Sequence, residues 1–334
     1  MIKHIIWKKK SLRVLDQRFL PRRTAYVDCR TAEAVARAIK DMVLRGAPLI
    51  GCSAAYGMAL AARQGSRAAL AKAARLLVQS RPTAVNLAHA VDAMLRASEG
   101  VPPGRLAVAL ARAAEAYFRA DLSANRQMGR LGARLLRKGS RVITHCNAGA
   151  LATSGIGTAL GVIREAFRQG RIAHVYADET RPYLQGSRLT LWELMEEGIP
   201  CTLITDNMAA HLMKVSRIDA VIVGSDRIAA NGDVCNKIGT YGLAISARHH
   251  GVPFYAVAPV STIDPDMADG SRIPIEERSV REVVEIAGIP IAPKGAAARH
   301  FAFDVTPASL VTAIVTERGV AKPPFKPGIR KLLA

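Results

Sequence analysis

The chain has 334 residues, of which 50% are hydrophobic and 22% are charged. This composition is that of a globular enzyme and excludes a disordered chain. The length exceeds the size at which a single hydrophobic core usually stops growing, so we expect two domains. No apolar run reaches the length of a membrane-spanning helix, which predicts a cytoplasmic protein with no membrane partner.

The formal net charge is +20, a value that on its own suggests a nucleic acid or an anionic membrane surface as partner. Aromatic residues make up only 5% of the chain, and the arginines are scattered rather than gathered into a stripe with stacking rings. We therefore expect no nucleic-acid partner and interpret the charge as an arginine-rich composition with a preference for anionic substrates. Basic clusters occur only at Lys8, Lys9 and Lys10 and near Lys322, Lys326, Arg330 and Lys331.

The five cysteines form no CxxC pair, and the histidines do not lie at metal-ligand spacing beside a cysteine pair. This pattern predicts a reduced protein with neither a disulfide framework nor a zinc site. The cysteines are Cys29, Cys52, Cys146, Cys201 and Cys235.

The first part of the chain is predicted to be an N-terminal helical domain, residues 1–135, with a small β appendage. Short β-branched and aromatic runs predict strands at 5–7, 12–15 and 24–27. An alanine-rich stretch with helical periodicity follows, punctuated by Gly, Pro and Ser. It predicts helices at 32–44, 54–63, 67–79, 87–97 and 106–130.

Residues 136–334 change to short β-branched strands that alternate with helical patterns, which indicates βαβ units and a parallel sheet. We expect a Rossmann-like, doubly wound α/β domain. Gly155, Gly157 and Gly161 do not have the GxGxxG spacing, and the sequence contains no GxxxxGK[ST] loop, so NAD and ATP are not expected as ligands. The predicted strands are 141–144, 173–177, 201–204, 220–223 and 253–258.

Cys146 and Asp226 are the candidate catalytic residues because each follows a predicted strand, so both would reach the same rim of the sheet. We expect the Cys146 turn to lead into a helix near Thr153, whose N-terminus would favour a thiolate. The alternatives are a buried thiol for Cys146, and an ion pair with Arg227 or a loop cap for Asp226. Asp233 belongs to an Asn-Gly-Asp turn and receives no catalytic part.

Further residues are predicted to contact a phosphate or a hydroxyl group. Asn236 and Lys237 would lie at the start of the helix after Asp226. The run from Arg45 through Gly46 and Ala47 to Pro48 would break a helix and expose backbone N–H groups beside a guanidinium. Arg81, followed by Pro82 and Thr83, would lie at another helix start, and a polar loop, 178–188, contains Gln185. A solvated helix cap is the alternative for each arginine.

Six motifs together resemble one known family. They are RGAPLIG (45–51), SRPTAVNL (80–87), THCNAGALAT (144–153), DETRPYLQGSRLT (178–190), TDNMA (205–209) and GSDRIAANGDVCNKIGTY (224–241). These motifs are similar to those of the S-methyl-5-thioribose-1-phosphate isomerases, which are relatives of the regulatory subunits of translation initiation factor 2B. The resemblance extends over residues 25–319.

The resemblance implies a homodimer with a site between a helical and a Rossmann-like domain, and with no metal or organic cofactor. It implies that Cys146 and Asp226 form the catalytic pair. Alanine is more typical of the family at Leu49, Leu191, Ser225 and Cys235. The implied substrate contacts are Arg45, Gly46, Ala47, Arg81, Gln185, Asn236 and Lys237.

The implied activity is conversion of S-methyl-5-thio-α-D-ribose 1-phosphate to S-methyl-5-thio-D-ribulose 1-phosphate in methionine salvage. An alternative within the class is isomerisation of ribose 1,5-bisphosphate or 5-deoxyribose 1-phosphate, which differ at C5. An alternative from another class is a non-catalytic regulatory subunit of a translation factor. Such a subunit has no need of Cys146 and Asp226 together.

Overall fold

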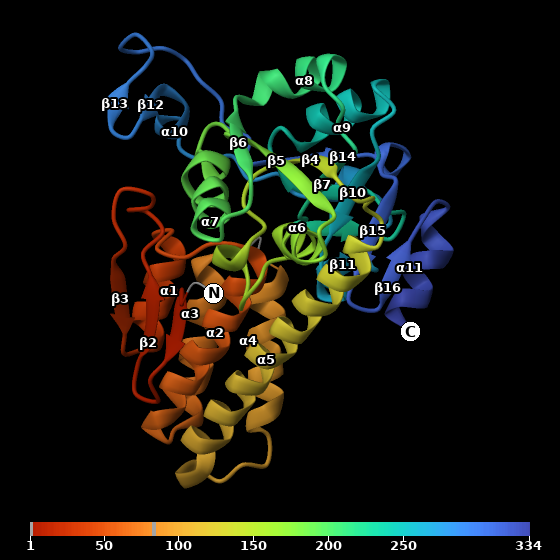
Figure 1. Cartoon of the computed structure of the whole chain (residues 1–334). Helices are drawn as coiled ribbons and strands as arrows, with labels where there is room; N and C mark the ends of the chain where they lie inside the picture. Colours follow the sequence, from red (N-terminus) through yellow and green to blue (C-terminus); the bar gives the residue numbers. More distant parts are fainter. Residues whose placement is uncertain (1–2, 82–84) are drawn as a thin grey trace. The chain divides into compact units, whose positions relative to one another are not determined.

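The computed structural model describes residues 3–81 and 85–334 (Figure 1). The chain divides into two compact units. Unit 1 comprises Met1–Gln127 and Ala148–Gly161, and unit 2 comprises Met128–Asn147 and Val162–Ala334. The boundary predicted between residues 135 and 136 therefore differs from the structure, because it misses the return of residues 148–161 to the first unit.

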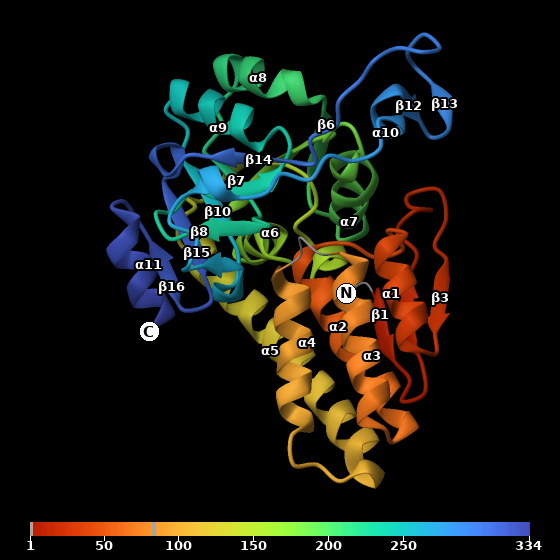
Figure 2. The same cartoon turned by 180° about the vertical axis from the view of Figure 1, so that it is seen from behind.

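Unit 1 combines a small antiparallel sheet with helices. The sheet has the order β1-β2-β3, formed by β1 (Ile5–Trp7), β2 (Leu12–Leu15) and β3 (Tyr26–Cys29). Figure 2 shows this sheet beside α1 and the long helices running alongside one another. The helices are α1 (Ala32–Lys40), α2 (Ala47–Ala61), α3 (Arg67–Ser80), α4 (Val85–Ser98) and α5 (Leu106–Ala133), the last of which continues into unit 2.

Helix α2 lies at the centre of the unit 1 core, since every residue from Pro48 to Ala61 is buried. Small residues allow its neighbours to approach closely. A Cβ atom on Gly51 would lie 2.9 Å from the Asn86 carbonyl oxygen of α4, and one on Gly57 would lie 3.2 Å from Leu77 of α3. The predicted helix start at residue 54 was wrong because an all-apolar helix shows no periodic edge in the sequence.

Unit 2 is built on a seven-stranded sheet with the order β16-β15-β10-β7-β4-β5-β6. Neighbouring strands pair in parallel, except that the edge strand β16 is antiparallel to β15. All five strands predicted for this region are present. The strands are β4 (Ser140–Thr144), β5 (Ile172–Asp178), β6 (Cys201–Ile204), β7 (Ala220–Val223), β10 (Phe254–Val257), β15 (Ala313–Thr316) and β16 (Gly319–Ala321).

Helices alternate with these strands, and the C-terminal helix lies beside β16 in both views (Figures 1 and 2). Among the described residues, none of the helices combines the length and apolar character needed to span a bilayer. The helices are α6 (Ala159–Arg168), α7 (Leu191–Glu196), α8 (Ala209–Val215), α9 (Thr240–His249), α10 (Arg281–Val284) and α11 (Phe325–Leu333).

A second, four-stranded sheet has the order β11-β8-β9-β14. It comprises β8 (Arg227–Ala229), β9 (Val234–Lys237), β11 (Ile263–Asp264) and β14 (Phe303–Thr306), and β12 (Glu285–Ile286) pairs separately with β13 (Ile289–Pro290). The expectation that Asp226 leads directly into a helix was wrong. The β8–β9 hairpin intervenes, so Asn236 and Lys237 lie on a strand and α9 begins only at Thr240.

Candidate active site

The two candidate catalytic residues leave neighbouring strands at the same edge of the large sheet. Strands β4 and β7 are adjacent and parallel, with Val142 opposite Ala220 and Ile143 opposite Val221. Cys146 follows the end of β4 at Thr144, and Asp226 follows the end of β7 at Val223. Because the strands are parallel, both turns emerge at the carboxyl edge of the sheet, as the sequence predicts.

Cys146 has a left-handed backbone conformation, with φ of 62°, which is strained for a residue with a side chain. Its backbone N–H donates to Thr180 Oγ1 at 2.8 Å, and its carbonyl accepts from Thr190 Oγ1 at 2.6 Å. Two threonine hydroxyls thus hold the strained residue on both sides. The thiol is buried, with 8% of the residue exposed.

The helix expected after Cys146 is not where the sequence placed it. The chain forms a short 3₁₀ turn, Ala150–Ala152, and α6 begins only at Ala159. Cys146 therefore does not lie at a helix N-terminus, and the argument that a helix dipole favours its thiolate fails. What the structure provides is a fixed backbone with buried neighbours on both sides.

Asn147, on one side of Cys146, belongs to a buried ionic network. Its Nδ2 donates to Glu193 Oε1 at 2.9 Å and to Thr190 Oγ1 at 3.2 Å. Glu193 pairs in turn with Arg164 at 2.7 Å, and Arg164 Nε donates to Glu197 at 2.5 Å. This network anchors the residue after the thiol to helices α6 and α7.

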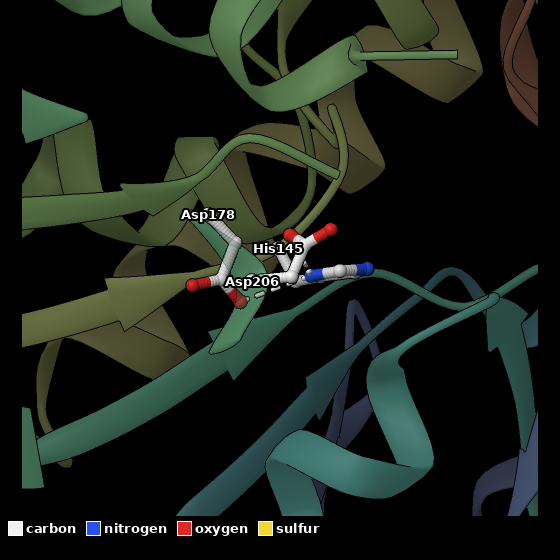
Figure 3. Close-up of side chains that lie close together, drawn as sticks. All are labelled: His145, Asp178 and Asp206. Atoms are coloured by element: carbon white, nitrogen blue, oxygen red, sulfur yellow. Dashed lines mark hydrogen bonds and ion pairs between the residues drawn. The ribbon is translucent and has the colours of Figure 1, made fainter. Parts of the chain in front are cut away.

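His145, on the other side, contacts two aspartates (Figure 3). Its Nδ1 lies 3.0 Å from Asp178 Oδ2 and 3.9 Å from Asp206 Oδ1, and its Nε2 lies 2.8 Å from the Ile238 carbonyl oxygen. A histidine and two carboxylates are a donor set that can hold a divalent cation. Here, however, both ring nitrogens are engaged by protein acceptors, so the cluster is organised as a hydrogen-bonded ion pair.

Asp226 is less constrained than Cys146. Its backbone N–H donates to the Cys235 carbonyl at 2.9 Å, and the residue is partly exposed. Within residues 3–81 and 85–334 its carboxylate makes no hydrogen bond or ion pair, and the predicted alternative partner, Arg227, pairs with Asp264 at 3.4 Å. The ion-pair alternative is therefore wrong, and the carboxylate is available to a ligand.

Three predicted substrate contacts also lie in unit 2 and are buried. Gln185 follows β5 and is 3% exposed, and its Oε1 has no hydrogen-bond partner among the described residues. Asn236 donates to Thr240 Oγ1 at 3.0 Å. Lys237 Nζ donates to the Ala302 carbonyl at 2.6 Å and lies 4.2 Å from the centre of the Phe303 ring. The Gln185 oxygen is thus an acceptor suited to a ligand hydroxyl.

The remaining predicted contacts lie in unit 1. Gly46, with φ of 100°, is the N-cap of α2 and makes no side-chain cap, and Ala47 begins the helix. A Cβ atom on Gly46 would lie 2.5 Å from the Ala152 Cα atom, so only glycine fits there. Arg45, which is 8% exposed, directly precedes this helix start. A helix start beside a guanidinium is a suitable anion site. The sequence analysis expected this motif to break a helix. In the structure it starts one.

Arg81 was predicted to lie at a helix start, and this prediction was wrong. Arg81 is the C-cap of α3. Its guanidinium Nη1 lies 3.5 Å from the sulfur of Met42. Pro82 and Thr83, which complete the predicted motif, lie outside the described residues.

Comparison with known proteins identifies the family. The sequence pattern of the initiation factor 2 subunit family matches residues 43–323. The chain belongs to this family.

Within the initiation factor 2 subunit family, the similar proteins carry two kinds of name. Methylthioribose-1-phosphate isomerase of Chloroflexus aurantiacus is 54% identical over 343 residues, covering 99% of this chain and 98% of that protein. The crystal structure of 5-methylthioribose 1-phosphate isomerase from Pyrococcus horikoshii OT3 is 44% identical with a TM-score of 0.92, covering 99% of this chain and 95% of that one. The crystal structure of the translation initiation factor eIF-2B, subunit delta, from A. fulgidus is also 44% identical, with a TM-score of 0.89 and coverage of 100% and 99%.

The sequence analysis assigned no role to His145, Asp178 or Asp206. The histidine directly precedes the candidate thiol, which is a signal that could have drawn attention to it. Its partners are far away in the sequence, however: Asp178 is 33 residues distant and Ile238 is 93 residues distant. Only the folded chain brings these groups together.

Proposed function

We propose that the protein isomerises S-methyl-5-thio-α-D-ribose 1-phosphate to S-methyl-5-thio-D-ribulose 1-phosphate, a step of methionine salvage. The observation that carries this proposal is the 54% identity to a methylthioribose-1-phosphate isomerase over nearly the whole of both chains. It is strengthened by the position of Cys146 and Asp226 at the ends of adjacent strands.

We infer that unit 2 is a Rossmann-like domain. Taken in chain order, the first six strands of its seven-stranded sheet are β4, β5, β6, β7, β10 and β15, so their spatial order reads 3-2-1-4-5-6. In such sheets the ligand crevice lies where the strand order reverses. That point is between β4 and β7, the two strands that precede Cys146 and Asp226.

The substrate explains the need for both a thiol and a carboxylate. The anomeric carbon is esterified with phosphate, so no free aldehyde is available and the ring must open first. Asp226, in its protonated form, is proposed to donate to the ring oxygen. Hydrogen then moves from C2 to C1 and the C2 hydroxyl gives its proton to the Asp226 carboxylate, which restores the acid. C2 thereby becomes a ketone, and C1 keeps the phosphate ester.

Two routes for this hydrogen are open to the proposed pair. In the first, the Cys146 thiolate takes the C2 proton, an enol phosphate forms, and a proton is returned to C1. In the second, a hydride passes directly from C2 to C1 and Cys146 assists it. Reaction in deuterium oxide separates them, because solvent deuterium at C1 of the product excludes an exclusive hydride shift.

We propose that the remaining predicted residues bind the substrate. Arg45, Gly46, Ala47 and Arg81 of unit 1 would contact the phosphate through guanidinium and backbone N–H groups. In unit 2, the orphaned Oε1 of Gln185 would accept from a sugar hydroxyl, and Asn236 and Lys237 would donate. We also infer that the protein is cytoplasmic and forms a homodimer. Light scattering of the purified protein tests the homodimer.

The second candidate function is a regulatory subunit of a translation factor. The similarity to the A. fulgidus structure named as an eIF-2B delta subunit favours it. The open carboxylate of Asp226 and the strained conformation of Cys146 have no evident purpose in a binding module, so the isomerase is the function that the site supports best.

Turnover by the purified protein decides between these functions. Phosphorus and proton NMR would follow methylthioribose 1-phosphate, with ribose 1,5-bisphosphate and 5-deoxyribose 1-phosphate as competing substrates. We expect conversion to the ketose phosphate, with the highest kcat/KM for the methylthio compound. Absence of turnover with all three compounds would contradict the isomerase assignment, and a higher kcat/KM for either competitor would contradict the choice of substrate.

A further inference from the structure

The ring of His145 makes hydrogen bonds from both nitrogens, which restricts its protonation. A carbonyl oxygen can only accept, so Nε2 carries the proton that it shares with the Ile238 carbonyl at 2.8 Å. The Nδ1 contact to Asp178 Oδ2 at 3.0 Å requires one more proton between the two groups. His145 and Asp178 therefore hold two protons together and form a pair with no net charge.

This pair connects three segments of unit 2. His145 follows β4, Asp178 ends β5, and Ile238 lies between β9 and α9. The imidazole also packs on the backbone of the β9–α9 turn, since a Cβ atom on Gly239 would lie 2.8 Å from the ring carbon Cε1. No larger residue fits at Gly239, which has φ of 101°.

A second chain of hydrogen bonds links the aspartates to Cys146. Asp206 Oδ1 accepts from the backbone N–H of Thr180 at 2.8 Å, and Thr180 Oγ1 donates to the Asp178 carbonyl at 3.1 Å. The same hydroxyl accepts from the N–H of Cys146. The cluster that binds the ring is thus also the cluster that holds the strained thiol residue.

We propose that His145 is a positioning residue for the isomerisation, whose doubly donating ring holds the Cys146 turn against the β9–α9 turn that follows Asn236 and Lys237. This inference rests on the proposed function. The bond to Asp178 serves the thiol, and the bond to Ile238 serves the segment that carries the substrate contacts.

The charges around the ring set its response to pH. Burial lowers the pKa of His145, but the hydrogen bond and charge of Asp178, with Asp206 and the Ile238 carbonyl, outweigh it and raise the pKa above that of an ordinary histidine. Asp304 on β14 also faces the ring, and burial raises the pKa of that carboxyl. When the pH rises through the folded pKa of His145, the ring loses its Nδ1 proton and three carboxyl groups surround a neutral histidine.

Three variants separate the two bonds. Asparagine can replace the Nδ1 donor of histidine and glutamine can replace the Nε2 donor, so His145→Asn keeps the tie to Asp178 and His145→Gln keeps the tie to Ile238. Asp178→Asn removes the charge that keeps the ring protonated. His174→Gln is the matched control, because His174 lies on β5, away from Cys146, and its Nε2 is hydrogen-bonded to Thr202 Oγ1 on β6 at 2.8 Å.

We expect His145→Gln to lower kcat by roughly ten- to a hundredfold, because the hydrogen bond to Asp178 that positions the thiol residue is lost. His145→Asn should mainly raise KM, because the hydrogen bond to Ile238 beside the substrate contacts is lost. In wild type kcat should fall as the pH rises through the folded pKa of His145. This basic limb should move to lower pH in Asp178→Asn and stay unchanged in His174→Gln. A merely structural role would lower activity equally at every pH.

Nitrogen NMR of the ring provides a readout that does not depend on turnover. On the acid side of the transition both ring nitrogens of His145 should carry a proton, and the Nδ1 proton should be lost at a lower pH in Asp178→Asn than in wild type. If the wild-type protein were inactive although its His145 ring was doubly protonated, the isomerase function would be contradicted. The hydrogen bonds of His145 to Asp178 and Ile238 would still stand. Full activity of both His145 variants, or a basic limb at the same pH in Asp178→Asn, would overturn the positioning role.

Discussion

The turn that carries Cys146 and the turn that carries Asp226 leave adjacent strands, yet they are built in opposite ways. The backbone of Cys146 is strained and both of its polar groups are bonded by threonine hydroxyls. The residues on either side of it belong to buried ionic networks. The backbone N–H of Asp226 is bonded, whereas its carboxylate has no hydrogen bond or ion pair within the part of the chain that the structure describes.

This difference matches what each group would have to do. A thiol that removes a proton from carbon needs a fixed approach to one atom, and misplacement by about 1 Å can cost a hundredfold in rate. A carboxyl that donates to the ring oxygen must follow that oxygen as the ring opens. A rigid turn suits the first task and an unpaired side chain suits the second.

Removal of the thiol should have the largest effect. We expect Cys146→Ser to lower kcat by on the order of 10³-fold. A serine hydroxyl is far less acidic than a thiol and stays protonated, and a neutral hydroxyl is a poorer base than a thiolate. Cys201→Ser is the control, since Cys201 lies on β6 and burial raises the pKa of its thiol. Unchanged turnover of Cys146→Ser in the NMR assay would remove the thiol from the mechanism.

Asp226→Asn should have the next largest effect, a loss of about a hundredfold in kcat. The amide keeps the shape of the side chain but cannot deliver a proton to the ring oxygen. The control is Asp266→Asn, a change at an exposed aspartate elsewhere in unit 2. If Asp226→Asn raised KM alone, the carboxyl would be a binding group and ring opening would need another acid.

The sequence predicted where the Cys146 and Asp226 turns lie better than how each turn is built. The strands that precede them could be recognised because β-branched runs such as Val221–Val223 point to buried parallel strands. Placing Cys146 and Asp226 at one sheet edge follows from that alone. The resemblance to a known family supplied the substrate contacts, which strand and turn patterns identify only weakly.

The local path after each turn could not be predicted in the same way. Strand β8 has three residues, and the sheet that it forms with β9 is completed by β11 beside β8 and by β14 beside β9, both of which lie much later in the chain. The Asn-Gly-Asp run at 231–233 indicates a turn, but the strands on either side of it are too short to be recognised from the sequence. The two hydrogen bonds that hold the backbone of Cys146 involve Thr180, 34 residues away, and Thr190, 44 residues away.

Loss of one of the two threonine hydrogen bonds to the backbone of Cys146 should have an intermediate effect. Thr180→Val keeps the branched shape but removes the hydroxyl to which the buried N–H of Cys146 donates, which should lower the free energy of unfolding by about 1–3 kcal/mol. We expect kcat to fall by about tenfold because the thiol is less well placed. Thr180→Ser restores the hydroxyl and should restore both values, as urea unfolding and the turnover assay would show.

The matching change in the Asp226 turn should have the smallest effect. Ser225 Oγ lies 2.9 Å from the Arg227 carbonyl and 3.0 Å from the Cys235 carbonyl, and the Cys235 carbonyl already accepts from the N–H of Asp226. Ser225→Ala therefore leaves no buried donor unsatisfied, and we expect it to lower the free energy of unfolding by about 0.5 kcal/mol with kcat changed by less than about twofold. A loss in kcat as large as that of Thr180→Val would mean that the carboxylate also depends on a fixed backbone, and the contrast between a rigid thiol and a mobile acid would not hold.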